Sequence, residues 1–224
     1  MIANSKQIIK KTKIFVKDYF QKDGTGHDWW HTKRVNDLAL KIARNEGGNL
    51  FIVEMSALLH DIGDYKFFNG NEKQGEEVIA NFLNSLPLTT DIINIILDIA
   101  GNVSFMKTLL KDKEFPENTL SKEFMAVSDA DKLDAMGAIG IARTFTYGGY
   151  YRRQIYDPDI PPNPDISQEE YKATDAPSIN HFYEKLLKLK DMMYTSYGKK
   201  LAYDRHQFLE KYLERFYAEW EGRA

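Results

Sequence analysis

The feature that most constrains this chain is an apolar stretch that ends in one histidine and two aspartates. Residues 57–64 read ALLHDIGD, so His60 and Asp61 adjoin at the end of a segment with the apolar content of a buried helix. A histidine offers a borderline-soft nitrogen and a carboxylate offers a hard oxygen, and together they can bind one divalent cation. Because a buried imidazole or carboxylate needs a partner, further polar groups are expected at this helix end.

Polar residues on two other apolar segments could complete such a site. Apolar side chains with helical spacing at 35–42 predict a helix, and His31 lies in its first turn. A second apolar run leads into Asp129, Asp131 and Asp134, and the last two share a helix face because they are three residues apart. Two histidines and two aspartates around one cation would satisfy all of these buried groups together.

The two imidazoles and two carboxylates would form a mixed nitrogen and oxygen donor set. With one or two waters, that set suits Mn, Co, Ni, Fe or Zn better than Mg, which prefers oxygen ligands but stays possible. An open coordination position implies catalysis by a bound water of lowered pKa. Asp61 and Asp64 are three residues apart, so one carboxylate can bind metal while the other orients water.

Composition argues against several other functions. The 224 residues include no cysteine, which excludes disulfides, a thiol nucleophile and cysteine-based metal sites. The formal net charge of -3 gives no sign of nucleic-acid or membrane binding, so we expect neither. No segment reaches the roughly 18 apolar residues that span a bilayer. Residues 1–13 lack a signal-peptide pattern, so we expect a cytoplasmic protein.

Helical periodicity runs through most of the chain, and no segment alternates convincingly as a strand does. We therefore predict an all-α fold with one domain over residues 1–224. Helices are expected at about 5–20, 30–46, 50–60, 72–86, 90–99, 121–134, 179–197 and 199–221. Residues 101–118 should form a surface loop. Five of the seven prolines fall in 148–177, a long irregular segment typical of a lid or binding loop.

These motifs resemble those of one family. The order of His31, His60-Asp61 and Asp131 resembles the H…HD…D signature of the HD-domain metal-dependent phosphohydrolases. The stretches similar to the YpgQ-like bacterial branch are GHDWWH at 26–31, ALLHDIGD at 57–64, DADKLDAMGAIGIAR at 129–143 and HFYEKLL at 181–187. A bare HD dipeptide is weak evidence, but this ordered set is specific and the similarity extends over nearly the whole chain.

The resemblance implies an all-helical fold, one divalent ion, usually Mn-like, and hydrolysis of phosphate esters or anhydrides. In this branch it implies cleavage of nucleoside triphosphates with release of pyrophosphate. The implied metal ligands are His31, His60, Asp61 and Asp131. Asp131 is preferred because an Ala-Asp-x-Leu pattern of other HD branches aligns there, and Asp129 is its competitor. Beside the catalytic Asp61, Asp64 is expected to help the attacking water lose its proton.

A polyphosphate brings negative charge to a site that is already rich in carboxylates, so cations must line the pocket. We expect Lys66, Arg143 and Lys185 to bind substrate, because they sit next to the motif segments. Each of them, taken singly, could instead be a solvated surface charge. Further candidates of the same kind are Lys33, Lys132, Arg152, Arg153 and Arg205.

Several aromatic and imidazole side chains have two readings. His27, four residues before His31, is expected to bind substrate, although a structural bond to the glycine-rich turn is equally open. Tyr147, Tyr150 and Tyr151 could stack a base from the long loop, or could be plain core or surface aromatics.

The residues leave two alternative functions open. A phosphomonoesterase or phosphodiesterase would use the same metal on another small phosphorylated metabolite. A non-catalytic nucleotide sensor would keep the site for binding alone, but a pure binder has no need for Asp64 beside the water. In each case the partner is a small molecule, and the sequence leaves a homodimer open.

Overall fold

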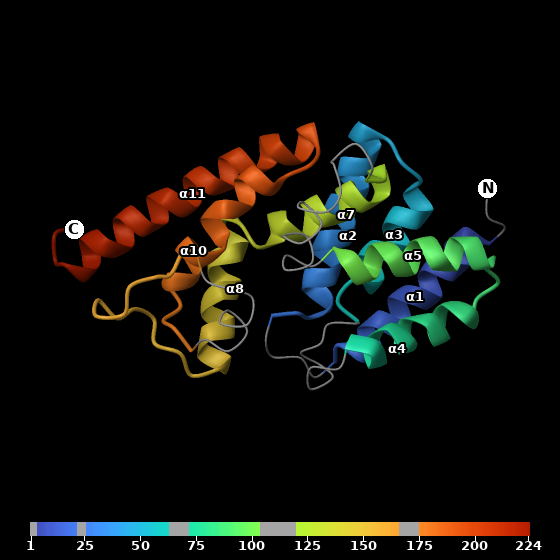
Figure 1. Cartoon of the computed structure of the whole chain (residues 1–224), viewed down its shortest axis with the longest axis horizontal. Coiled ribbons are helices and arrows are strands. Elements are labelled where there is room, and N and C mark those ends of the chain that lie inside the picture. The colour runs from blue at the N-terminus through green and yellow to red at the C-terminus, as the bar shows by residue number, and fades with distance from the viewer. Residues whose placement is uncertain (1–3, 22–25, 63–71, 104–119, 166–174) are drawn as a thin grey trace. The chain divides into compact units, whose positions relative to one another are not determined.

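The computed structural model describes residues 4–21, 26–62, 72–103, 120–165 and 175–224 (Figure 1). All regular structure in these ranges is helical, which confirms the all-α class. The helices are α1 (Ser5–Tyr19), α2 (Trp29–Glu46), α3 (Leu50–Leu59), α4 (Glu72–Asn84), α5 (Thr90–Asn102), α7 (Lys122–Asp134), α8 (Gly137–Tyr150), α10 (Asn180–Glu184), the 3₁₀ helix η3 (Leu186–Met192) and α11 (Ser196–Trp220). Within the described ranges, no helix is both long and apolar enough to cross a membrane.

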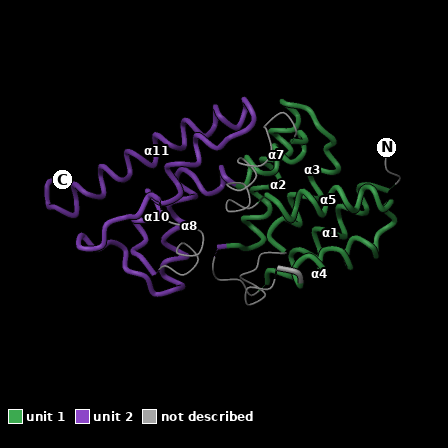
Figure 2. The backbone as a smooth tube through the Cα atoms, in the orientation of Figure 1, with its two compact units in different colours: residues 1–23, 27–131 green, residues 24–26, 132–224 purple. Residues whose placement is uncertain are grey.

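The chain divides into two compact units, which Figure 2 shows in different colours. Unit 1 comprises residues 1–23 and 27–131, and unit 2 comprises residues 24–26 and 132–224. The boundary falls within α7, between Asp131 and Lys132. The expectation of one domain over 1–224 stays a prediction.

In unit 1, α3 lies against α1, α2 and α5. It is apolar on nearly every side, and a helix of that kind is stable only when other helices surround it. Val53, Met55 and Leu58 on α3 are accordingly inaccessible to solvent. The helix begins at a side-chain cap, because Oδ1 of Asn49 accepts hydrogen bonds from the backbone N–H groups of the second and third helical residues. The burial of α3 carries the His60-Asp61 pair into the interior.

Helix α2 has a clear start and stop in the sequence. At its start, Oδ1 of Asp28 accepts a hydrogen bond of 2.8 Å from the backbone N–H of His31. It ends at Gly47, where φ is 95°, a backbone conformation that favours glycine. The inward side chains Val35, Ala39 and Ile42 are fully buried, so the prediction of His31 in the first turn of a helix is confirmed.

In unit 2, α8 packs against α11. Gly148 lets Ser178 approach the backbone of α8 closely, because a Cβ at position 148 would lie 2.1 Å from Oγ of Ser178. Phe145 of α8 and Tyr212 of α11 meet with ring centroids 6.2 Å apart, and Phe182 stacks on Tyr212 at 5.7 Å. This aromatic cluster is the core that joins α8, α10 and α11.

Two boundaries differ from the sequence prediction. The long irregular segment begins later than 148, because α8 continues through Tyr150. The single helix predicted over 179–197 is wrong: α10 ends at Glu184, Lys185 has φ −138°, and η3 follows. The carbonyl of Met192, which would bond to residue 196 in a continuous α-helix, instead accepts a hydrogen bond of 2.9 Å from Nζ of Lys132. Tertiary contacts therefore override an amphipathic pattern that is typical of an α-helix.

Candidate metal centre

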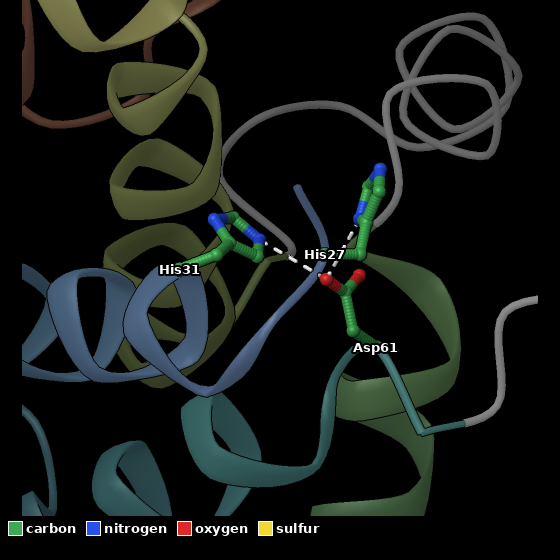
Figure 3. A group of neighbouring side chains, drawn as sticks. All are labelled: His27, His31 and Asp61. Carbon is green, nitrogen blue, oxygen red and sulfur yellow. Dashed lines mark hydrogen bonds and ion pairs between the residues drawn. The ribbon is translucent and has the colours of Figure 1, made fainter. Parts of the chain in front are cut away.

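Asp61 lies at the centre of a cluster of three histidines in unit 1. Its Oδ2 is 3.1 Å from Nε2 of His31 and 3.0 Å from Nδ1 of His27. Figure 3 shows these two imidazoles converging on one carboxylate from the start of α2 and the segment before it. The other oxygen of Asp61, Oδ1, is 3.4 Å from Nε2 of His60. Both carboxylate oxygens of one residue thus face imidazole nitrogens.

Asp131 on α7 completes the cluster. Its Oδ1 lies 3.6 Å from Nε2 of His31 and 3.7 Å from Nε2 of His60. The four predicted ligands, which are distant along the chain, are therefore neighbours in space. Their nitrogen and oxygen atoms fall into two groups that could hold a metal ion, one formed by His27, His31 and Asp61 and the other by His31, His60 and Asp131.

Local backbone contacts fix the two histidines that are buried most deeply. His31 is held by the cap of α2, and its side chain is completely buried. His60 follows α3 directly, and its Nδ1 lies 2.9 Å from the carbonyl oxygen of Ala57. The backbone after Asp61 is also held in place, because the hydroxyl of Tyr19 donates a hydrogen bond of 3.1 Å to the carbonyl of Ile62.

The orientation of His60 leaves one nitrogen for a ligand. With the N–H on Nδ1 donating to Ala57, the lone pair lies on Nε2, an arrangement that is typical of metal-bound histidines. Nε2 is buried and has no hydrogen-bond partner among the residues that the structure describes. A buried polar atom without such a partner is rare in folded proteins. The nitrogen therefore points to a group that binds here.

The cluster is buried at His31 and His60 and more open at His27 and Asp131. The side chain of His60 is 2% exposed, whereas Asp61 is 11%, His27 is 19% and Asp131 is 24% exposed. A ligand or water would therefore approach past Asp131 and His27 rather than past His60. The arrangement matches a metal centre with open coordination positions.

The charges in the cluster depend strongly on one another. Burial lowers the pKa of His60, but the carboxylates of Asp61 and Asp131 outweigh burial and raise this pKa to about 9. Burial raises the pKa of Asp61 and of Asp131, but the facing imidazoles have the larger, opposite effect. The pKa of Asp61 is therefore well below its usual range, and the pKa of Asp131 is about 2. In the metal-free protein, a histidine proton thus neutralises carboxylate charge that a cation would otherwise neutralise.

The spacing of the donor atoms is compatible with binding of a divalent ion. Ligand bonds of about 2.1 Å place neighbouring donors about 3.0 Å apart in an octahedron and about 3.4 Å apart in a tetrahedron. The observed separations of 3.1 to 3.7 Å between imidazole nitrogens and carboxylate oxygens lie close to this range. The donor types suit such an ion, as does Nε2 of His60, which has no hydrogen-bond partner among the described residues.

The two competitors on α7 are in different surroundings. Asp129 is completely buried but belongs to neither of the two donor groups, whereas Asp131 belongs to one. Two residues along a helix correspond to a turn of about 200° around its axis, so these side chains leave it in nearly opposite directions. The geometry of the described residues favours Asp131 as the fourth ligand.

The predicted substrate-binding residues are dispersed. Asp64 and Lys66 lie outside the described residues. Arg143 and Lys185 belong to unit 2, where Nη1 of Arg143 donates to Oδ2 of Asp134 at 3.1 Å and Lys185 is partly buried. His27, which is expected to bind substrate, contacts Asp61, and its role toward substrate stays a prediction. The position of His27, just before the Asp28 cap, could have indicated this contact, because a side chain there can reach the neighbouring helix end.

Comparison with known proteins places the chain in a family. Residues 29–136 match the family model of the HD domain. The Bacillus subtilis (strain 168) protein YpgQ is 33% identical over 207 residues, which cover 92% of this chain and 90% of YpgQ. The chain is an HD-domain protein of the YpgQ-like branch. This confirms the resemblance seen in its motifs.

Solved structures extend the likeness of this HD-domain protein over its whole length. A Lactobacillus plantarum protein has a TM-score of 0.84 at 35% identity, covering 99% of this chain and 100% of its own. A Bacillus thuringiensis HD-superfamily hydrolase has a TM-score of 0.74 at 42% identity, with coverage of 97% and 99%. B. subtilis YpgQ, solved in complex with ADP, has a TM-score of 0.73 at 29% identity, with coverage of 96% and 100%. The chain is thus an HD-superfamily hydrolase with a His/Asp cluster that could hold a divalent ion.

Proposed function

We propose that this HD-domain protein is a metal-dependent phosphohydrolase that converts nucleoside or deoxynucleoside triphosphates to the monophosphate and pyrophosphate. The observation that carries the proposal is the convergence of His31, His60 and Asp61 with Asp131, because these side chains offer one ion two nitrogens and two carboxylates. The nucleotide substrate is supported by the relative YpgQ, whose structure was solved with ADP.

We assign His31, His60, Asp61 and Asp131 as ligands of one divalent ion, and the mixed donor set favours Mn²⁺. The ion would supply a water of lowered pKa and polarise a phosphoryl oxygen. His27 would keep Oδ2 of Asp61 in position through its contact of 3.0 Å. Asp64 is proposed to accept the proton of the attacking water.

The negative charge of a triphosphate requires cationic side chains in addition to the ion. Lys66 and Lys185 are proposed for this role from their places in the sequence. Arg143 is proposed as well, with one restriction: its Nη1 is already paired with Asp134, so substrate would bind through its other N–H groups.

The test is hydrolysis with identification of the products. The purified protein is incubated with Mn²⁺ and a panel of nucleoside triphosphates, and the products are separated by chromatography. Pyrophosphate and monophosphate in equal amounts are expected, with loss of turnover after chelation. Orthophosphate as the sole inorganic product would support the phosphomonoesterase alternative instead. Full turnover by the chelated protein would overturn the metal-dependent mechanism.

A further inference from the structure

The end of α8 in unit 2 carries a cluster of aromatic and basic side chains. Tyr150 is 58% exposed and Tyr151 is 47% exposed, and their rings meet edge to face at 5.1 Å. Tyr151 also lies against Tyr147 at 4.6 Å. The guanidinium of Arg153 lies over the ring of Tyr147 at 5.4 Å, within the range of a cation–π contact. Two tyrosine rings are thus held at the surface with part of their area open to solvent.

Arg152 has a backbone conformation that is unusual for its residue type. The backbone N–H of Arg153 donates to the carbonyl of Gly148 at 2.8 Å, and that of Arg152 donates to Gly149 at 3.2 Å. This pair of bonds is the Schellman motif, which ends a helix with one residue in the left-handed region, usually glycine. Here that residue is Arg152, with φ 58°. An arginine in a strained position that suits glycine indicates that its side chain has a use there.

The side chain of Arg152 is exposed and forms no ion pair within the described parts of the chain. The segment that follows is firmly attached, because the N–H groups of Ser178 and Ile179 donate to the carbonyls of Gln154 and Ile155 at 2.9 and 3.0 Å. A guanidinium next to two partly exposed tyrosine rings is therefore presented on a fixed backbone. Little backbone conformational entropy would be lost when a ligand binds.

We propose that Tyr150, Tyr151 and Arg152 form a nucleotide-recognition surface, on which a tyrosine ring stacks against the base and the guanidinium pairs with a phosphate. Stacking on a tyrosine face suits any base, and a guanidinium binds a phosphate through two parallel N–H bonds. The inference rests on the proposed nucleotide substrate and names groups that would recognise it.

The test measures ADP binding by calorimetry in the presence of EDTA, so that a metal ion makes no contribution. Wild-type protein is expected to bind ADP more tightly than either adenosine or inorganic phosphate alone. The double variant Tyr150→Leu/Tyr151→Leu should weaken ADP binding about 5-fold or more. Tyr203→Leu on α11, which removes a tyrosine of similar exposure (56%), should leave it within about twofold.

Arg152→Gly separates binding from folding, because the two effects have opposite signs. Glycine relieves the left-handed strain, so Tm should rise by about 2 to 4 °C, while ADP binding weakens about tenfold through loss of the charge. Arg152→Lys should keep ADP binding within about threefold.

ADP binding that is unchanged in Arg152→Gly or in the double tyrosine variant would overturn the proposal, as would no ADP binding by wild-type protein in EDTA. Binding of a single-stranded oligonucleotide but not ADP, or a change of oligomeric state in these variants with unchanged ADP binding, would do the same.

Hydrolysis by the wild-type protein distinguishes this inference from the proposed function. If Mn²⁺-loaded protein leaves every triphosphate intact while the patch variants still weaken ADP binding, the phosphohydrolase proposal fails and the recognition surface stands. If hydrolysis proceeds and the patch variants keep their ADP affinity, the recognition surface fails and the phosphohydrolase stands.

Discussion

Asp131 and Asp134 stand three residues apart on α7, yet their charges are balanced in different ways. Asp134 accepts a hydrogen bond of 3.1 Å from Arg143. Both side chains are largely buried, with 5% of Asp134 and 17% of Arg143 exposed. Among the described residues, Asp131 faces imidazoles alone, with nitrogens at 3.6 and 3.7 Å, and its side chain is 24% exposed. The first carboxylate is thus paired with a permanent cation, and the second has no such partner in the part of the chain that the structure describes.

The difference separates a structural charge from a ligand-binding one. A guanidinium stays protonated at any accessible pH, so the Asp134–Arg143 pair is complete once the chain has folded. An imidazole can give up its proton and bind a metal ion through the same nitrogen. The carboxylates of Asp61 and Asp131 can therefore exchange a histidine proton for a divalent cation.

The largest expected effect follows from breaking the metal cluster. His60→Ala or Asp61→Ala removes one proposed ligand, and Asp61 also touches three imidazoles. Because loss of even an outer partner of a metal ligand costs roughly 10- to 100-fold, turnover of nucleoside triphosphates should fall by more than about 100-fold. Metal content of the purified variants, measured by mass spectrometry, should fall in parallel. If a variant retains both metal and turnover, the substituted residue is not a metal ligand.

The Asp134–Arg143 pair should behave in the opposite way. Asp134→Asn leaves a buried guanidinium without its carboxylate, which should lower the free energy of unfolding by about 2 to 3 kcal/mol, somewhat less than for a fully buried pair. Metal affinity should stay within about twofold of wild type. Denaturant unfolding and metal titration on the same sample test both statements. A loss of metal binding as large as in Asp61→Ala would erase the distinction between the two carboxylates.

The choice between Asp131 and Asp129 predicts a smaller, selective effect. Asp131→Asn keeps the shape of the side chain but removes the charge that faces His31 and His60, so Mn²⁺ affinity should fall by about 10- to 100-fold. Asp129→Asn changes a carboxylate that belongs to neither donor group, and Mn²⁺ affinity should change less than about threefold. A reversed order of the two variants would make Asp129 the ligand.

Much of the fold could be predicted from the sequence because local patterns decide it. The all-α class and the positions of α2, α3 and α7 follow from apolar spacing and from stop signals such as Gly47. The break at Lys185 could not be predicted, because the amphipathic pattern continues through it. What ends α10 and shapes η3 is a set of distant contacts, among them the bond from Lys132 to the carbonyl of Met192.

The site shows the same limit. Sequence order and apolar surroundings single out His31, His60, Asp61 and Asp131, and the structure brings these side chains close together. Their roles as ligands stay a proposal. The partner of Arg143 could not be predicted, since two charges nine residues apart meet only because Gly137 turns the chain between α7 and α8 at φ 66°. A positive residue near a motif thus proved to have a fixed internal partner, which spacing alone does not indicate.

The most direct test of proton exchange is the pH dependence of metal binding. In the metal-free protein the pKa of His60 is raised to about 9 from an ordinary value of 6.5, so His60 is protonated at neutral pH and must lose a proton to bind metal. The carboxylates contribute nothing in this window, because the pKa of Asp131 is about 2 and that of Asp61 is well below its usual range. Mn²⁺ affinity should therefore rise by about tenfold per pH unit between pH 7 and 9, with release of about one proton. Calorimetry in two buffers of different ionisation enthalpy measures that proton.

Stability of the metal-free protein should change in the reverse direction. A group whose pKa is higher in the folded than in the unfolded state stabilises the fold fully below the unfolded pKa, and this contribution is lost as pH rises through the folded pKa. The stabilisation from His60 is thus complete below about pH 6.5 and disappears as pH rises to about 9, so metal-free Tm should decline across that range. Metal-loaded protein should lack this particular decline, because its His60 is already neutral. An identical pH profile for the two forms would show that His60 does not exchange its proton for the ion, and the contrast between Asp131 and Asp134 would then lose its physical basis.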